Sequence, residues 1–187
     1  MFNLDKKLIE NSYKKIIDSL GDYVDQKGVK DTPKRVANTY EELLSGYTAD
    51  IEKIINNALF DVEYDQIVIV KNIRFYSLCE HHILPFFGKI DIGYLPNSKI
   101  IGLSKIPRIT QVFSKRLQVQ ERLTEQIGKA IFENTNALGA GVVINAQHMC
   151  SSMRGVNMPS TEMVTSSLFG TFKSDDATRK EFFDLIK

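Results

Sequence analysis

The chain has 187 residues, of which 43% are hydrophobic and 25% charged, a composition typical of a globular domain with an ordinary core. Its 24 basic and 23 acidic residues give a formal net charge of +1, so no overall field attracts nucleic acid or an anionic membrane. No apolar stretch is long enough to cross a bilayer, and residues 1–10 lack the apolar centre of a signal peptide. We therefore expect a cytoplasmic protein without nucleic-acid or membrane partners, in which both cysteines are reduced.

Three helices are predicted in the first third of the chain. Apolar residues recur at helical spacing over residues 4–20 and stop at Gly21, which suits a helix C-terminus. A second helix is expected to begin with Thr32 and Pro33, a favourable N-cap and first-turn pair. A third is expected over residues 50–59, where isoleucines lie on one face.

The next part of the chain has the β-branched and aromatic runs that favour strands. QIVIV and IRFYSL before Cys79, and FFGKIDIGYL after it, predict two strands that meet at a loop. Helical spacing returns over residues 104–136, with a break near Leu117. Two more strands, GVVINAQHMC and MVTSSLFGTF, precede a closing helix capped by Asp175 or Asp176. The order ααα, ββααββ, α predicts an α+β fold with an antiparallel sheet.

The residues that bind metals most readily are confined to two short segments. All 3 histidines and both cysteines lie in CEHH, which begins at Cys79, and HMC, which begins at His148. Alternation along the preceding strand predicts that His148 and Cys150 share one face. Cys79 and His82 are three positions apart in a turn-like segment, where both side chains can reach one ion. Thiolates and imidazoles together favour zinc (Zn²⁺) over calcium or magnesium.

These candidates outnumber the positions of a tetrahedral ion. If three bind, the ion keeps an open position for water, and two imidazoles remain as general acid and base. If four bind, the zinc is structural and the protein is a non-catalytic binding module, which is the alternative hypothesis. The residues alone leave open which histidine is the third ligand.

Basic residues near these segments suit the phosphates of a nucleotide. Ser104, Lys105 and Arg108 lie at a predicted helix start, where free N–H groups and the helix dipole favour phosphate. Arg154 follows the HMC segment and Arg35 lies in the second predicted helix. The alternative for each of these charges is a solvated position on the surface.

Two residues of the segment QVQERL suit a purine base. Gln120 offers an amide and Glu121 a carboxylate. A carboxylate is a natural acceptor for the two adjacent N–H donors on the edge of guanine, although most helical glutamates face water.

Taken together, CEHH, GLSK followed by PR, RLQVQERLT, HMC, MRGV and TSSLFGTF with a closing TRKEF resemble the motifs of GTP cyclohydrolase I, from about residue 31 to the last residue. The resemblance implies the tunnelling fold, with an N-terminal helical region over residues 1–60 and a catalytic ββααββ domain over residues 61–187. It also implies a homo-oligomer, a decamer in which sheets associate into barrels. A relative with another activity is the alternative within this fold, such as a nitrile reductase with a cysteine nucleophile and a nicotinamide cofactor.

The resemblance further implies a reaction and a role for each candidate residue. The reaction is the zinc-dependent hydrolysis and rearrangement of GTP to 7,8-dihydroneopterin triphosphate and formate, the first step of tetrahydrofolate and pterin biosynthesis. The implied zinc ligands are Cys79, His82 and Cys150. The implied catalytic residues are His81, His148 and Ser104. The implied substrate contacts are Gln120 and Glu121 for guanine, and Arg35, Lys105, Arg108 and Arg154 for the triphosphate.

Two features depart from the family's motifs. Some members carry a lysine at the position of Asn38, so the resemblance does not imply a phosphate contact at this position. The first predicted helix contains none of the motifs, and we expect it to have a structural role.

Overall fold

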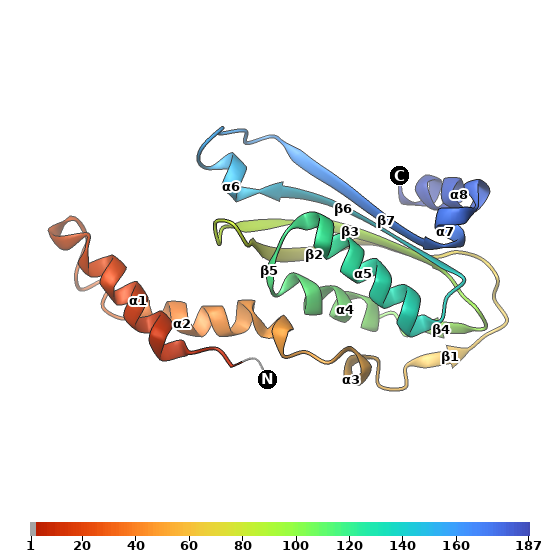
Figure 1. The fold of residues 1–187 in the computed structure, drawn as a ribbon, viewed down its shortest axis with the longest axis horizontal. Helices are drawn as coiled ribbons and strands as arrows, with labels where there is room; N and C mark the ends of the chain where they lie inside the picture. The colour runs from red at the N-terminus through yellow and green to blue at the C-terminus, as the bar shows by residue number, and fades with distance from the viewer. Residues whose placement is uncertain (1–2) are drawn as a thin grey trace.

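The computed structural model describes residues 3–187, and in it helices pack on a twisted, mainly antiparallel sheet (Figure 1). The first two residues of the predicted 1–60 region lie outside this description. The helices are α1 (Lys6–Asp18), α2 (Thr32–Leu43), α3 (Ile51–Ile55), α4 (Lys105–Ser114), α5 (Gln120–Thr135), α6 (Met149–Ser152), α7 (Thr171–Ser174) and α8 (Asp176–Ile186), with short 3-10 turns at Gly21–Tyr23 and Ser45–Tyr47. The strands are β1 (Leu59–Asp61), β2 (Val68–Cys79), β3 (Pro85–Leu95), β4 (Lys99–Ile101), β5 (Leu117–Gln118), β6 (Gly139–His148) and β7 (Glu162–Gly170).

The first two helices form a hairpin that extends away from the sheet (Figure 1). Helix α1 begins after Asp5, whose carboxylate accepts a hydrogen bond from the Leu8 N–H at 2.8 Å. The chain leaves the helix before Gly21, which has a positive φ of 56°. The hydroxyls of Tyr13 and Tyr40 are 2.8 Å apart and join α1 to α2. The two predicted helices are therefore confirmed, although the N-cap of α2 is Asp31 and not Thr32, and no residue of α1 is buried.

The third predicted helix is shorter than expected, and the prediction of helix for residues 56–59 is wrong. Helix α3 ends at Ile55, because Asn56 and Asn57 adopt positive φ values of 41° and 57°. Asparagine tolerates this left-handed conformation better than most residues. Leu59, predicted to be helical, instead pairs with Ile101 in the small sheet of β1 and β4.

The main sheet has the strand order β5-β2-β3-β6-β7. Strand β2 pairs with β3, β3 with β6 and β6 with β7, all antiparallel, while β5 adds a two-residue parallel contact to β2. The predicted helical stretch over residues 104–136 is indeed two helices, with β5 between them. The chain therefore runs β2-β3-α4-α5-β6-β7 through this unit, which is the ββααββ order of the tunnelling fold.

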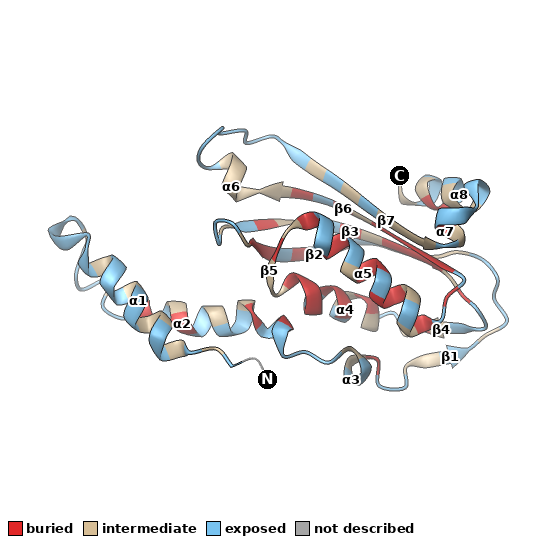
Figure 2. Ribbon diagram, in the orientation of Figure 1, coloured by how far each residue is buried: buried red, intermediate tan, exposed pale blue. Residues whose placement is uncertain are grey.

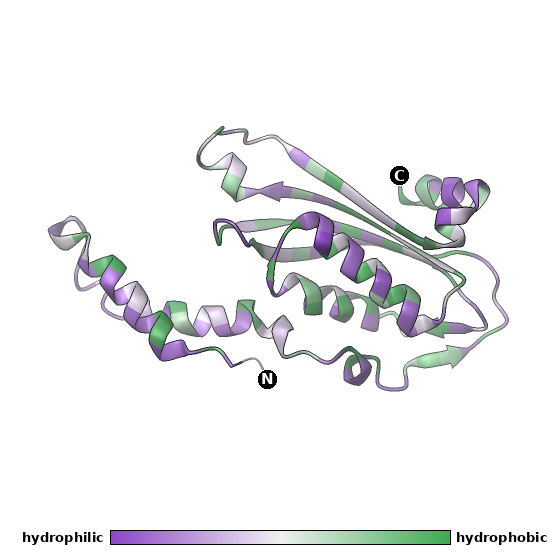
Figure 3. Cartoon of the chain, viewed as in Figure 1, coloured by the Kyte–Doolittle hydropathy of each residue, from purple (hydrophilic) through white to green (hydrophobic). Residues whose placement is uncertain are grey.

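Helices α4 and α5 cover one face of the main sheet, and the core lies between them (Figure 2). Ile144 on β6 and Ile127 on α5 are among the fully buried side chains of this layer. Figure 3 shows apolar and polar residues alternating along the strands and around α5, as a half-buried sheet and an amphipathic helix require. At one end of the opposite face, Phe182 of α8 packs against Gly93 and Gly141, where a Cβ atom would meet its ring.

Strand β2 contains a β-bulge that joins the two runs predicted before Cys79. The pairing with β3 shifts between Val70 and Ile73, and Asn72 has a positive φ of 60°. The Asn72 N–H donates a hydrogen bond to the Asp91 carboxylate at 2.7 Å, so the extra residue is held in place. Beyond the bulge, alternate residues of β2 up to Cys79 enter the core.

The last strands and the closing helix follow the prediction with one correction. Strand β6 ends at His148, so Cys150 lies in the short helix α6 and not on the face of the strand. Asp175 caps α8 by accepting hydrogen bonds from the N–H and hydroxyl of Thr178. None of the helices within residues 3–187 has the length and apolar character needed to cross a membrane.

Candidate active site

Three predicted metal ligands converge at one end of the main sheet. The ligand atoms of Cys79, His82 and Cys150 all lie within 4.8 Å of one another, and Cys79 is buried while His82 is exposed. Burial and the neighbouring Cys79 raise the pKa of the Cys150 thiol, so a bound cation would be needed to stabilise Cys150 as a thiolate. Two sulfur atoms and one imidazole are a donor set that fits zinc, and one position of a tetrahedral ion would remain open. The residues present therefore fit the metal that the motifs imply.

The first two ligands are held by the tight loop between β2 and β3. The Cys79 N–H donates to the Leu84 carbonyl at 2.9 Å, and the Ile83 N–H donates to the Cys79 carbonyl at 2.8 Å. Ile83 has a φ of 54°, a conformation that is strained for a β-branched residue. The Glu80 N–H donates to the Gln118 carbonyl of β5 at 3.0 Å, which ties the loop to the start of α5. These bonds set Cys79 and His82 on the same side of the loop.

Two more candidate residues border the cluster. The Nδ1 atom of His81 lies 3.8 Å from the Cys79 sulfur. One guanidinium nitrogen of Arg154 lies 3.3 Å from Nε2 of His82 and 3.5 Å from the Cys150 carbonyl. The structure thus brings an exposed imidazole and an exposed positive charge to the metal ligands.

His148 is more strongly fixed than the other two histidines. It is the residue paired with Phe86 across β6 and β3, and the two rings stack in parallel with centroids 4.7 Å apart. Its Nε2 atom lies 2.8 Å from the amide oxygen of Gln120. Burial lowers the pKa of His148, and the nearby Glu121 carboxylate opposes this shift. His148 is therefore a half-buried imidazole with a fixed ring, two residues before Cys150.

The two residues predicted to bind guanine have opposite environments at the start of α5. Gln120 is only 1% exposed, and its amide nitrogen donates to the carbonyls of Ile144 and Met163. Glu121 follows it in the first helical turn with an exposed side chain. That Gln120 and Glu121 contact guanine stays a prediction. Of the two side chains, only the Glu121 carboxylate is exposed to a ligand.

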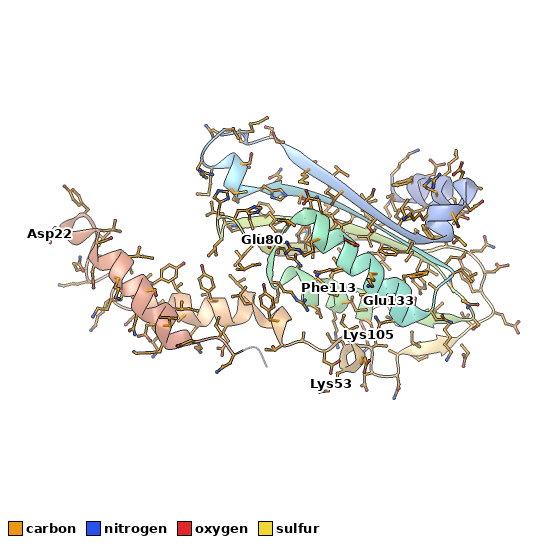
Figure 4. All side chains as sticks on the ribbon, in the orientation of Figure 1. Asp22, Lys53, Glu80, Lys105, Phe113 and Glu133 are labelled. Carbon is orange, nitrogen blue, oxygen red and sulfur yellow. The ribbon has the colours of Figure 1, made fainter. Side chains whose placement is uncertain are left out.

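The remaining candidates lie away from the metal ligands of the same chain. Ser104 and Lys105 stand at the start of α4, whose other end adjoins β5, and Arg108 is one turn further along. A helix of ten residues is about 15 Å long, and Figure 4 shows Lys105 well separated from Glu80 of the metal loop. Arg35 is exposed on α2 and lies 3.9 Å from Asp31. One chain therefore does not bring these residues to its own metal cluster.

The sequence reasoning missed an ion pair that supports the metal loop. Arg122 of α5 makes two hydrogen bonds to the Glu80 carboxylate, at 2.6 and 2.9 Å, and this pairing lowers the pKa of Glu80. The two residues are 42 positions apart, so no local spacing rule connects them. Only the pairing of β5 with β2 places the first turn of α5 beside the loop.

An antiparallel ββααββ sheet that brings two thiols and an imidazole within reach of one ion, with two further imidazoles close by in the chain, defines a tunnelling-fold protein with a candidate metal centre. The family model of GTP cyclohydrolase I matches residues 9–187, which includes most of α1 as well as the motifs that begin near residue 31. The chain belongs to the GTP cyclohydrolase I family.

Two relatives of about 50% identity agree with this membership. GTP cyclohydrolase 1 of Leptospira biflexa is 51% identical over 179 residues, which cover 96% of this chain and 98% of the relative. GTP cyclohydrolase 1 of Campylobacter jejuni is 50% identical over 181 residues, which cover 97% of this chain and 95% of the relative. Among solved structures, the archaeosine synthase QueF-Like in the apo form is 13% identical with a TM-score of 0.48, and the match covers 58% of this chain and 97% of that chain.

Proposed function

We propose that this protein converts GTP to 7,8-dihydroneopterin triphosphate and formate with a zinc ion held by Cys79, His82 and Cys150. The observation that carries the proposal is the convergence of these ligand atoms within 4.8 Å of one another, with His81 and His148 next to them in the chain. When bound, zinc supplies a Lewis acid that lowers the pKa of water to about 7 and so provides a nucleophile for C8 of the purine.

The chain's own residues bind the base and move the protons. The exposed Glu121 carboxylate accepts hydrogen bonds from N1–H and N2–H₂ of guanine. One of the two remaining imidazoles, His81 or His148, donates a proton to N7 as the C8 bond to it opens, and the other removes a proton from the attacking water. A second hydrolysis releases C8 as formate. The same pair then serves the ribose rearrangement and the closure of the pterin ring, with Ser104 of a neighbouring copy near the ribose.

We further propose that the complete site forms in a homo-oligomer, a decamer in the cytoplasm. The phosphate-binding candidates Lys105 and Arg108 lie in the N-terminal half of α4, away from the metal ligands, whereas Arg154 contacts the metal ligand His82 of the same chain. If all three contact one triphosphate, Lys105 and Arg108 come from a neighbouring copy. Residues 1–60 would then be a helical region that supports assembly, and residues 61–187 the catalytic domain.

The test of the reaction is a product assay on the purified, zinc-loaded protein. We expect equal amounts of formate and dihydroneopterin triphosphate from GTP, measured together by mass spectrometry. Formate without a pterin would place the protein on a branch that opens the ring without rebuilding it. If the assay detects neither formate nor a pterin, GTP is refuted as the substrate.

Paired substitutions test the ligand assignment. Cys150→Ser removes a proposed ligand and is expected to lose zinc and turnover together. His148→Ala is expected to keep zinc and to lose turnover, because it removes a proton-transfer group and no ligand. Loss of zinc from His148→Ala, measured by elemental analysis, would contradict the assignment.

A further inference from the structure

The orientation of the Gln120 amide is determined by its surroundings. Its nitrogen lies 3.1 Å from the Ile144 carbonyl oxygen and 2.9 Å from the Met163 carbonyl oxygen. Carbonyl oxygens only accept hydrogen bonds, so the NH₂ group must face them. The reversed amide would place its oxygen against two other oxygens in a buried site. The amide oxygen of Gln120 must therefore face His148, where it lies 2.8 Å from Nε2.

This orientation assigns the proton on His148. An amide oxygen only accepts a hydrogen bond, so Nε2 of His148 must carry a hydrogen in order to donate one. In a neutral imidazole the other nitrogen, Nδ1, is then unprotonated. No hydrogen bond of the described residues engages Nδ1 of His148, in contrast to Nε2.

The amide itself is fixed by a buried network that spans three elements. The Thr124 hydroxyl donates to the Gln120 backbone carbonyl at 2.7 Å and lies 2.6 Å from the Thr165 hydroxyl. Thr165 must then donate to Thr124, which leaves its own oxygen, 3.1 Å from the Gln120 amide nitrogen, to share one of the two amide hydrogens with a carbonyl. Gln120 and Thr124 are each 1% exposed, so water does not compete for these bonds. The network holds α5 against β6 and β7 at the place where His148 ends its strand.

We propose that Gln120 is a positioning residue that keeps His148 as the Nε2–H tautomer, with Nδ1 as the nitrogen that exchanges protons with the substrate. Phe86 completes the arrangement, because its ring stacks on the imidazole and prevents rotation out of the plane of the hydrogen bond. Gln120 then serves catalysis through His148 and does not contact guanine. This inference rests on the proposed function for its kinetic consequence, but the tautomer can be measured without any turnover.

The first experiment is solid-state NMR of sedimented, zinc-loaded protein that carries ¹⁵N-labelled histidine. With only 3 histidines, the signals of His148 are identified as those missing from the His148→Ala variant. We expect a protonated Nε2 and an unprotonated Nδ1. The opposite tautomer in the unmodified protein would overturn the proposal, whether or not the protein acts on GTP and without the need for a Gln120 variant that folds.

The second experiment compares Gln120→Met with Gln126→Met. Methionine keeps the length of the side chain and removes both hydrogen-bonding groups. Gln126 lies on the same helix and accepts a hydrogen bond from Gln118 at 2.8 Å, so its substitution removes a similar amide without a contact to His148. We expect kcat of Gln120→Met to fall by at least about 10-fold. This loss is smaller than the ~10²-fold loss of rate that misplacement of a catalytic group by about 1 Å can cause. The KM for GTP should change by less than about 2-fold, and zinc content should not change.

The same variants separate positioning from guanine binding. In Gln120→Met the His148 signals should show a mixture of tautomers, whereas Gln126→Met should match the unmodified protein in both signals and kcat. If Gln120 instead held guanine, Gln120→Met would raise the KM for GTP with kcat intact and would change the preference for GTP over inosine triphosphate, which lacks the 2-amino group. That result would overturn the proposal.

Discussion

The N-terminal hairpin and the sheet with α4 and α5 use the same kinds of residues with opposite results. Helix α1 is amphipathic, yet none of its residues is buried, and its contacts within the chain are mainly with α2. Helix α5 buries eight residues against the sheet. The metal ligands and His148 all belong to the sheet and the segments that extend from it, and none of them belongs to the hairpin. Amphipathic periodicity alone did not distinguish the two regions.

The largest difference between the regions is expected for aromatic side chains. Phe86→Ala removes a fully buried ring from the sheet and should lower the free energy of unfolding by about 3–5 kcal/mol. Tyr23→Ala, at the tip of the hairpin, removes a ring that is 99% exposed and should change it by less than about 0.5 kcal/mol. Denaturant unfolding of both variants measures the contrast, and equal losses would refute it.

A smaller effect is expected at the support of the metal loop. Arg122→Met removes both hydrogen bonds to Glu80 and should weaken zinc binding by about 10-fold, the lower end of the effect of residues that orient metal ligands. Lys129→Met on the same helix removes only an exposed ion pair with Glu133 and serves as the control. Competition with a chromophoric chelator measures both affinities. An unchanged affinity in Arg122→Met would mean that the backbone bonds of the loop position Cys79 and His82 unaided.

Some features of this fold could be predicted from the sequence, and others could not. The ββααββ order, the two metal segments and the cap at Asp175 were predictable, because each depends on local periodicity or on residue types that metals select. The end of α3 was not, because two consecutive asparagines turned the chain where the isoleucine spacing continued to indicate helix.

The neighbours of His148 were equally inaccessible from local patterns. Gln120 contacts it across 28 positions and Thr165 contacts Gln120 across 45, so the tertiary fold alone brings them together. Residue type was ambiguous as well, since a glutamine beside a glutamate suits a guanine edge and a buried imidazole alike. The burial of Gln120 distinguishes a contact with His148 from a contact with guanine. Sequence patterns do not predict whether a residue in the first turn of a helix is buried.

Within the hairpin, the effect of a buried polar contact should be local. Tyr40→Phe removes the hydrogen bond to Tyr13 and should lower the opening free energy of α1 by about 1 kcal/mol. Hydrogen exchange of the α1 amides is then about fivefold faster, while exchange in α5 is unchanged. Tyr23→Phe is the matched control, because its hydroxyl has no partner among the described hydrogen bonds that it could lose. Faster exchange throughout the sheet would show that the hairpin and the sheet unfold as one unit.

The smallest effect is expected on the outer side of α5. Lys129→Ala breaks an exposed pair with Glu133 whose atoms are 3.8 Å apart, and it should change the free energy of unfolding by at most about 0.5 kcal/mol. Thermal or denaturant unfolding at low and high salt checks this value. A loss above about 1 kcal/mol would mean that even the solvent side of this helix contributes to the stability of the sheet.

The bulge at Asn72 makes a change in the length of β2 tolerable at this point and harmful beyond it. Side chains alternate across a strand, but the bulge sets two residues opposite one, so Val70 and Ile73 lie on the same face although they are three positions apart. Deletion of Asn72 would restore the regular alternation and keep Cys79 on the face of Val70. Deletion of a residue between Ile73 and Cys79, where the pairing with β3 has no extra residue, would instead turn Cys79 to the other side of the sheet.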